Sequence, residues 1–274
     1  MAGCQCAQAT TCSSHGNLIR LGVNIRDFDY LIALAGNPNT GKTTLFNALS
    51  GLRQHTGNWP GKTVVRSEGA FRHNGYKYKV VDLPGTYSLL STSEDEEIAR
   101  DFILFGNPDC VVVVVDATAL ERNLNLVLQV LEITDRVVVA LNLMDEAERK
   151  GMFVDARKLA KELGVPVVPM VAREGKGTDH LLQTVQDLVT GNLRTQPRRI
   201  ELDPHIEEAV QQLLPHLKNL YPNLSNHRWL AMRLLEGDPS IRRAILTDSL
   251  AQTESPLAPQ KEEDMSELEA ALEV

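Results

Sequence analysis

The strongest constraint on the fold of this sequence is one glycine-rich segment, Gly36-Asn-Pro-Asn-Thr-Gly-Lys-Thr43. It follows a short apolar run, Tyr30–Ala35, and it precedes a stretch with apolar residues on one helical face, Thr44–Leu52. A G-x4-G-K-[ST] pattern between a strand and a helix is typical of a phosphate-binding loop, whose backbone N–H groups curl around a phosphate. The segment therefore predicts a strand, a phosphate loop and a helix in direct succession.

Apolar runs of strand length alternate with stretches of helical spacing after this loop. The further predicted strands are Tyr76–Asp82, Cys110–Asp116, Arg136–Asn142 and Pro166–Met170. The further predicted helices are Asp95–Phe105, Asn123–Ile133, Val154–Leu163 and Thr178–Val189. Strands that are apolar throughout and alternate with helices are typical of a parallel sheet covered on both faces. We therefore expect an α/β domain with a doubly wound parallel sheet over residues 28–193.

The pattern changes after Gly191. Apolar residues then recur only at helical spacing, at Ile206, Val210, Leu213, Leu214 and Leu217 and again at Leu230, Leu234 and Leu235. We expect a small all-helical domain over residues 200–255, followed by an acidic tail over residues 256–274. Residues 1–27 precede the first strand and are expected to form a disordered extension, as chain termini often do.

The charge of the chain is concentrated at its C-terminal end. The net charge is −8, and residues 248–274 hold eight acidic residues and one lysine, so the preceding part is nearly neutral. Nucleic-acid binding needs a basic face, so we expect no nucleic-acid partner. No stretch approaches the roughly 18 to 20 apolar residues of a membrane-spanning helix, and the N-terminus lacks the pattern of a secretory signal. As a fragment, the chain is expected to be soluble.

Three of the four cysteines lie near the N-terminus, at Cys4, Cys6 and Cys12, with His15 close by in sequence. Thiolates and imidazoles are good metal ligands, but this spacing fits no zinc pattern. We interpret the segment as a tail that carries thiols, and a metal-sensing role stays open as an alternative. Cys110 opens an apolar strand and is expected to be a small buried hydrophobic residue.

The phosphate loop is expected to contact a nucleotide and a magnesium ion. Lys42 reaches the β- and γ-phosphates, and the hydroxyl group of Thr43 ligates Mg²⁺. The helix that begins at Gly41 directs the positive end of its dipole at the phosphates. The expected nucleotide contacts in this segment are Asn37, Asn39, Thr40, Gly41, Lys42, Thr43 and Thr44.

A second motif, Asp82-Leu-Pro-Gly85, lies at the end of the next predicted strand. Its aspartate can hold the water shell of Mg²⁺, and Gly85 can offer its N–H to the γ-phosphate. Between the two motifs lies Gly57-Asn-Trp-Pro-Gly-Lys-Thr63, whose glycines and proline suit a mobile loop in which Trp59 is exposed. A threonine at Thr63 ligates Mg²⁺ only when GTP is bound, so this segment is a candidate switch.

A third motif, Asn142-Leu-Met-Asp145, follows the predicted strand that ends at Asn142. The carboxylate of Asp145 can accept hydrogen bonds from guanine N1–H and from the exocyclic amine, a pair of donors that adenine lacks. The order of the phosphate loop, D-x-x-G and N-x-x-D, each after a strand, predicts a P-loop GTPase. A P-loop kinase is disfavoured by Asp145 and by the D-x-x-G motif.

Together these segments resemble the cytosolic G domain of the bacterial ferrous iron transport protein B family, FeoB. The similarity extends from about Tyr30 to Asp238. Its distinctive segments are residues 36–47, 57–61, 82–89, 116–117, 120–124 and 228–238. The last of them resembles the helical spacer domain that follows the G domain in this family.

The resemblance implies more than the motifs do. Family members continue into a membrane region that moves Fe²⁺, which implies a cytosolic portion at the cytoplasmic face of the bacterial inner membrane. The resemblance also implies hydrolysis stimulated by K⁺, with Asn39 and backbone carbonyls near Gly57 and Trp59 as ligands. A K⁺ ion between the β- and γ-phosphates would act where other GTPases insert an arginine. The residues that the resemblance and the motifs imply to act in catalysis are Lys42, Thr63, Gly85 and Asn39.

Three positions depart from the pattern of many GTPases. Thr86 stands where Ras-like proteins have the glutamine that orients the attacking water, and the FeoB family shares this lack. Leu143 replaces a lysine that stacks along the base, and the loop after the last strand reads Val171-Ala172-Arg173 instead of Ser-Ala. Ala172 can still offer its N–H to guanine O6. These changes predict micromolar nucleotide affinity.

Two hypotheses of function result. The first is a slow Mg²⁺-dependent GTPase whose switch loops report the nucleotide state to an attached iron channel. The second is a sensor module that binds GTP and GDP with negligible hydrolysis, since no side chain is an obvious catalytic base. The sequence leaves the hydrolysis rate and the oligomeric state open, including a homo-oligomer.

Overall fold

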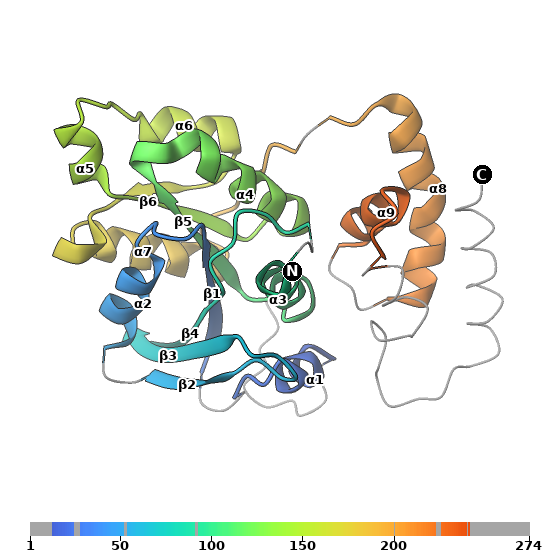
Figure 1. Ribbon diagram of the computed structural model, residues 1–274, viewed down its shortest axis with the longest axis horizontal. Coiled ribbons are helices and arrows are strands. Elements are labelled where there is room, and N and C mark those ends of the chain that lie inside the picture. The colour runs from blue at the N-terminus through green and yellow to red at the C-terminus, as the bar shows by residue number, and fades with distance from the viewer. Residues whose placement is uncertain are drawn as a thin grey trace. The chain divides into compact units, whose positions relative to one another are not determined.

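The computed structural model describes residues 13–24, 28–51, 54–90, 93–199, 201–222, 226–239 and 241. The chain divides into two compact units, residues 1–199 and residues 200–274. The first unit contains the sheet, and the second contains helices α8 and α9 (Figure 1). The predicted thiol-bearing tail with Cys4, Cys6 and Cys12 and the predicted acidic tail over residues 256–274 lie outside the described residues.

The first unit is built on a seven-stranded sheet with the order β2-β3-β4-β1-β5-β6-β7. Its strands are β1 (Tyr30–Gly36), β2 (Gln54–Asn58), β3 (Val65–His73), β4 (Tyr76–Asp82), β5 (Cys110–Asp116), β6 (Val137–Asn142) and β7 (Val167–Pro169). The strands from β4 through β1 to β7 are parallel, whereas β2 and β3 are antiparallel at one edge. The predicted α/β fold with a doubly wound sheet is confirmed, and the structure adds two antiparallel strands at one edge of the predicted parallel sheet.

The predicted mobile loop over residues 57–63 forms the end of β2 and the turn between the two antiparallel strands. Every residue of β2 is exposed, and its sequence, Gln-His-Thr-Gly-Asn, carries no hydrophobic signal. Its pairing with β3 extends from Gln54 opposite Gly69 to Asn58 opposite Val65. This edge of the sheet therefore depends on backbone hydrogen bonds rather than on the burial of apolar side chains, and periodicity does not reveal it.

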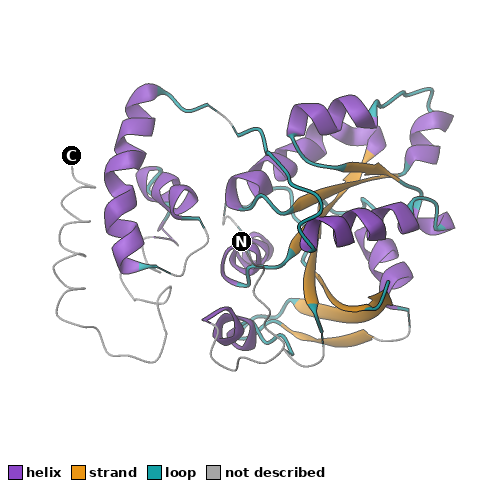
Figure 2. Cartoon of the chain, turned by 180° about the vertical axis from the view of Figure 1, so that it is seen from behind, coloured by secondary structure: helices purple, strands orange, loops and turns teal. Residues whose placement is uncertain are grey.

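Helices cover both faces of the sheet (Figures 1 and 2). The helices of this unit are α1 (Ser13–Arg20), α2 (Lys42–Ser50), α3 (Glu94–Phe105), α4 (Leu120–Ile133), α5 (Met144–Arg149), α6 (Ala156–Leu163) and α7 (Thr178–Val189). α2 and α7 lie on one face, where their apolar residues form a single buried cluster with the central strands. α3 and α4 lie on the opposite face. The central strands are therefore buried from both sides, which explains their uninterrupted apolar sequences.

The segment before the first strand contains a helix, α1, that packs against α3. Leu18 is buried there, and Asn17 Nδ2 donates a hydrogen bond to Phe105 O at 3.2 Å. The prediction of a disordered extension over residues 1–27 is therefore wrong for Ser13–Arg20, because one face of this short helix covers part of α3. Residues 1–12 lie outside the described part of the chain.

The second unit contains α8 (Pro204–Leu220) and α9 (His227–Leu235), which pack against each other. The residues buried in this unit include Val210, Leu213, Leu217, Leu230 and Leu234. Asp203 caps α8 by accepting a hydrogen bond from His205 N at 2.9 Å. The predicted helical character of this region is confirmed for its described residues.

Candidate nucleotide-binding site

The three sequence motifs meet at the carboxyl edge of the parallel strands. β1 ends at Gly36, β4 ends at Asp82 and β6 ends at Asn142. Leu34 lies opposite Asp82, and Asp116 lies opposite Asn142, so these strands end at nearly the same level. In doubly wound sheets, ligands bind at this edge, where the loops of neighbouring strands diverge. The motifs therefore lie where such a sheet offers a binding site.

The phosphate loop turns sharply between β1 and α2. Asn39 (φ 66°) and Gly41 (φ 85°) have left-handed backbone conformations. Thr40 Oγ1 donates a hydrogen bond to Asn37 O at 2.9 Å inside the turn. A Cβ atom at Gly41 would lie 2.3 Å from Asn142 Nδ2, so both the backbone conformation and the close packing require glycine. This turn directs the first N–H groups of α2 at the space where a phosphate binds.

The side chain of Lys42 is buried and connects the phosphate loop to the second motif. Its ammonium group forms an ion pair with Asp82 and donates a hydrogen bond to Leu83 O at 2.6 Å. The pKa of Asp82 is nevertheless raised, because burial disfavours the carboxylate more than the neighbouring Lys42 and the hydroxyl of Thr43 stabilise it. A further positive charge next to Asp82 would therefore stabilise the ionised form of its carboxylate.

The predicted magnesium ligands are only partly assembled. The hydroxyl of Thr43 lies close enough to Asp82 to stabilise its carboxylate, so a hydroxyl and a carboxylate oxygen, the kind of ligand that Mg²⁺ prefers, lie near each other. Thr63 is exposed in the turn between β2 and β3 and makes no hydrogen bond or ion pair with any described residue. Two of the three predicted ligands therefore fit a magnesium site in this conformation.

The predicted potassium ligands do not meet. Asn39 lies exposed in the phosphate loop, whereas Gly57 lies in β2 opposite Arg66 of β3. Strands β3 and β4 separate β2 from β1, which places the two strands about 14 Å apart at the usual strand spacing. Trp59 O already accepts a hydrogen bond from Lys62 N at 3.0 Å. The predicted K⁺ site is therefore absent from this conformation of the described residues, because the segment forms a hairpin instead.

The prediction that Trp59 is exposed is wrong. Its side chain is only 2% exposed, and its ring packs edge-on against Phe102 of α3 with the ring centroids 5.6 Å apart. The guanidinium carbon of Arg66 lies 5.7 Å from the centroid of the same ring. Burial of so large an aromatic surface stabilises the hairpin against α3. The candidate switch segment is therefore anchored at Trp59.

The glycine of the second motif lies beside the phosphate loop. A Cβ atom at Gly85 would meet the backbone of Pro38 at 3.4 Å, and Thr86 N donates a hydrogen bond to Gly36 O at 3.3 Å.

The side chain of Asn37, at the start of the phosphate loop, is 3% exposed, and neither of its polar atoms has a hydrogen-bond partner among the described residues. Buried polar atoms without partners are rare in folded proteins, which is consistent with a ligand that contacts this loop.

Asn142 joins the phosphate loop to the loop over residues 171–176, which we call the base loop. Its Nδ2 donates to Thr40 O at 2.9 Å, and its Oδ1 accepts from Ala172 N at 2.9 Å. The prediction that the Ala172 N–H is available to guanine O6 is wrong for this conformation, because Asn142 already accepts from it. The motif spacing identified Asn142, but it does not predict which backbone groups form hydrogen bonds with its buried amide.

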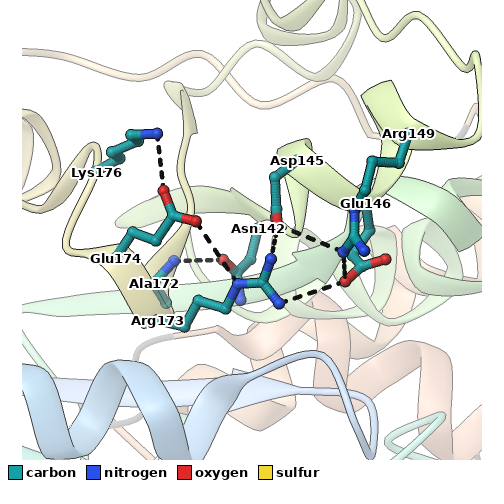
Figure 3. A network of polar contacts seen from close by, with 8 residues as sticks. All are labelled: Asn142, Asp145, Glu146, Arg149, Ala172, Arg173, Glu174 and Lys176. Atoms are coloured by element: carbon teal, nitrogen blue, oxygen red, sulfur yellow. Dashed lines mark hydrogen bonds and ion pairs between the residues drawn. The ribbon is translucent and has the colours of Figure 1, made fainter.

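The carboxylate of Asp145 lies in the first turn of α5 and faces the base loop (Figure 3). Its Oδ2 accepts a hydrogen bond from Arg173 of the base loop and lies 3.7 Å from Arg149 Nη2. Its Oδ1 is buried and has no hydrogen-bond partner among the described residues. A buried carboxylate oxygen without a donor is unfavourable, so Oδ1 is an acceptor suited to a ligand. Sequence reasoning missed the Arg173 contact, although a cation next to Ala172 was a signal for it.

Fold and site together define the first unit as a GTP-binding G domain of the phosphate-loop class. Its described strands and helices carry the three motifs in the expected order. The chain belongs to the family of ferrous iron transport protein B: the family model of that description matches residues 30–185. A second model, the FeoB cytosolic helical domain, matches residues 203–273. The resemblance inferred from the motif segments is therefore confirmed.

Curated relatives and solved structures agree with this assignment. The Fe(2+) transporter FeoB of Salmonella typhimurium is 42% identical over 241 residues, which are 85% of this chain and 30% of that protein. The chain thus spans less than a third of the length of the curated relatives it matches. The cytosolic domain of L. pneumophila FeoB is 36% identical, with a TM-score of 0.72 over 89% of this chain and 95% of that chain.

A further solved structure is the cytosolic domain of T. maritima FeoB in GDP form I. It is 34% identical to this chain, with a TM-score of 0.71 over 89% of this chain and 96% of that chain. Within the described ranges of the present chain, no helix is long and apolar enough to cross a membrane. The comparisons therefore cover the G domain and the helical domain together.

Proposed function

We propose that the chain binds GTP together with Mg²⁺ and hydrolyses it to GDP and phosphate. The observation that carries this proposal is the convergence of three motif segments on one edge of the sheet. Lys42 of the phosphate loop pairs with Asp82 of the second motif. Asn142 of the third motif links the phosphate loop to the base loop. The related cytosolic domain of T. maritima, solved in a GDP form, supports a guanine nucleotide as the ligand.

Each part of the site has its own role in this proposal. Lys42 binds the β- and γ-phosphates, and Gly85 offers its N–H to the γ-phosphate. Asp145 accepts hydrogen bonds from guanine, which distinguishes it from adenine. Thr43 and Asp82 would hold Mg²⁺, which would neutralise charge on the phosphate oxygens. The protein thereby positions GTP and stabilises charge, which is the main contribution that such enzymes make to phosphoryl transfer.

The hydrolysis is proposed to be slow. Thr86 stands where Ras-like proteins have the glutamine that orients water, and it is buried. Its hydroxyl group donates a hydrogen bond to Ser88 O at 2.7 Å, so it is already engaged within the protein. The attacking water must therefore be oriented by other groups, and backbone groups of the switch segments are the candidates.

Stimulation by K⁺ is part of the same proposal, and it concerns a conformation in which residues 57–63 have left the β2–β3 hairpin. In the hairpin, Gly57 and Trp59 do not meet Asn39, and no step is assigned to K⁺ there. The support for K⁺ is the family membership together with the exposed position of Asn39 in the phosphate loop. In that conformation Thr63 is the further candidate for Mg²⁺.

The test is GTP hydrolysis in matched KCl and NaCl buffers, for the wild-type chain and for Asn39→Ala. We expect hydrolysis to be on the order of tenfold faster in KCl or more, because a bound K⁺ ion would supply the positive charge that an arginine finger supplies in other GTPases. We expect this difference to disappear in Asn39→Ala. Equal, near-zero rates in both salts would contradict hydrolysis. They would favour the second candidate, a GTP/GDP sensor, to which the buried and engaged Thr86 also points.

For the whole protein, we propose that this chain is the cytosolic portion of a ferrous iron transporter, at the cytoplasmic face of the bacterial inner membrane. Its nucleotide state would regulate or drive Fe²⁺ uptake through an attached membrane region. The support is the family membership and the 42% identity to a protein named Fe(2+) transporter FeoB. A chimera in which this chain replaces the matching part of that relative should restore Fe²⁺ uptake to a deficient strain. Failure of the wild-type chimera, with normal expression, would contradict the proposal.

A further inference from the structure

The base end of the site contains a cation that the proposed function does not use. Arg173 donates a hydrogen bond to Asp145 Oδ2, and its Nη1 lies 3.5 Å from Glu146 Oε1. Figure 3 shows the guanidinium group between Asp145, Glu146 and Glu174. We propose that Arg173 competes with guanine for the carboxylate of Asp145 and thereby sets how tightly the site holds a guanine nucleotide. This inference rests on the proposed binding of guanine nucleotides.

Guanine recognition needs both oxygens of Asp145. Guanine presents two neighbouring donors, N1–H and the exocyclic amine, and a carboxylate accepts them as a pair. Oδ1 has no partner among the described residues, whereas Oδ2 is already hydrogen-bonded to Arg173. The guanidinium group lies beside Oδ2 and offsets the negative charge of the carboxylate. Oδ2 can accept a second hydrogen bond, but Arg173 takes one of its two acceptor sites, so Arg173 weakens the contact between guanine and Asp145.

The base loop holds the backbone of Arg173 in place on both sides. Val171 and Lys176 form an antiparallel bridge, in which Val171 N donates to Lys176 O at 3.0 Å. The N–H of Ala172 donates to Asn142 Oδ1 at 2.9 Å. Since the backbone is fixed at these points, the exchange between Arg173 and guanine requires a movement of the arginine side chain alone.

Arg173 has other carboxylates within reach once it leaves Asp145. Its Nη1 lies 3.5 Å from Glu146 Oε1, and its Nε lies 3.9 Å from Glu174 Oε1. Its side chain is 53% exposed, so the charge stays hydrated after the exchange. Ion pairs this exposed contribute little free energy. The competition therefore weakens the binding of guanine nucleotides by a small factor and favours the release of GDP, without blocking the site.

The experiment compares calorimetric titrations of GDP into the wild-type chain and into Arg173→Ala. We expect GDP to bind about two- to fivefold more tightly to the variant, the size of effect that an exposed ion pair gives. The matched control is Arg149→Ala, because Arg149 Nη2 lies 3.7 Å from the same oxygen, beyond hydrogen-bond distance. We expect less than a twofold change in this control. Thermal unfolding of each variant checks that the fold is retained.

Two further readouts separate competition from a general structural role. In an Asp145→Asn background, the difference between arginine and alanine at position 173 should disappear, since an amide forms no ion pair. In the wild-type background, the same difference should shrink when the salt concentration rises from about 0.1 to 0.5 M, because salt screens exposed charges. Both readouts follow from a competing ion pair, whereas a change in the packing of the loop would leave the difference in place at high salt and in the Asp145→Asn background.

The outcomes are distinct. Unchanged or weaker binding of GDP to Arg173→Ala would overturn the inference, and weaker binding would mean that the arginine contacts the nucleotide. Tighter binding that persists in the Asp145→Asn background would also overturn it, because the effect would then act through another residue. A wild-type chain that binds no GDP at all would overturn the proposed function itself, and this inference with it.

Discussion

The two ends of the candidate site hold their carboxylates in different ways. At the phosphate end, the ion pair of Lys42 and Asp82 is buried, with side chains 9% and 11% exposed. At the base end, the ion pair of Arg173 and Asp145 has side chains 53% and 20% exposed. A nucleotide with Mg²⁺ offers a new partner to both members of the first pair. Guanine offers donors to Asp145 alone, so only the base end begins with a contact that opposes its ligand.

This difference determines where large and small effects should be found. Removing one partner of a buried charged pair costs about 3–5 kcal/mol, whereas an exposed pair contributes about 0.2–1 kcal/mol. Substitutions at the phosphate end should therefore weaken the binding of every nucleotide strongly. Substitutions at the base end should act on guanine nucleotides selectively, and the direction of the effect should depend on which partner is removed.

The largest effect is expected for Lys42→Ala. GTP and GDP should bind about a hundredfold more weakly or worse, because a buried charged contact worth roughly 2–5 kcal/mol is lost. Asp82, whose pKa is already raised, then loses the cation next to it and takes up a proton more readily. Calorimetric titration with both nucleotides measures the loss. Lys218→Ala, at an exposed lysine of α8, is the matched control and should bind like the wild-type chain.

A loss of less than tenfold in Lys42→Ala would break the comparison, because the phosphate end would then be no more demanding than the base end. A loss that accompanies unfolding would be uninformative about binding, so thermal unfolding is recorded for the same samples. Lys42→Arg adds a second test. An arginine keeps the charge but is too large for the space around Lys42, whose side chain is only 9% exposed. This variant should therefore also bind the nucleotides more weakly than the wild-type chain does.

The phosphate end could be predicted from the sequence in more detail than the base end. The phosphate loop and the strands Tyr76–Asp82 and Cys110–Asp116 have the predicted bounds. Cys110–Asp116 is apolar up to its last residue because it is buried on both faces of the sheet. Since a parallel sheet aligns the ends of its strands, Asp82 had to lie close to the loop that contains Lys42. The motifs alone therefore indicated which residues meet there.

The features that the sequence did not reveal depend on contacts between distant residues. Trp59 is buried because it meets Phe102 of α3, and nothing in its glycine-rich neighbourhood signals this contact. β2 has only exposed residues and is stabilised by its backbone pairing with β3. The ion pair of Arg173 with Asp145 joins the base loop to the first turn of α5, 28 residues away in sequence. Neither hydrophobic periodicity nor motif spacing predicts any of these contacts.

A smaller and more selective effect is expected for Asp145→Ala. GDP should bind about 30- to 150-fold more weakly, because two hydrogen bonds to a charged group contribute roughly 2–3 kcal/mol. ADP, which lacks the matching donors, should bind as it does to the wild-type chain. Titrations with both diphosphates measure the two affinities, with Glu148→Ala, an exposed acid of α5, as the control. Equal losses for GDP and ADP would show that Asp145 acts on the fold and not on the base.

Of these three losses of affinity, the smallest is expected for Asn142→Ala, at a residue that connects the two ends. Its removal leaves Thr40 O and Ala172 N without their hydrogen-bond partner, so both loops should loosen and GDP should bind about tenfold more weakly. The decisive probe is pyrophosphate with Mg²⁺, which has no base. It should bind several-fold more weakly to Asn142→Ala, because Asn142 supports the phosphate loop through Thr40. It should bind normally to Asp145→Ala, which serves as the matched control. Normal binding of pyrophosphate to Asn142→Ala would confine Asn142 to the base end and separate the two ends completely.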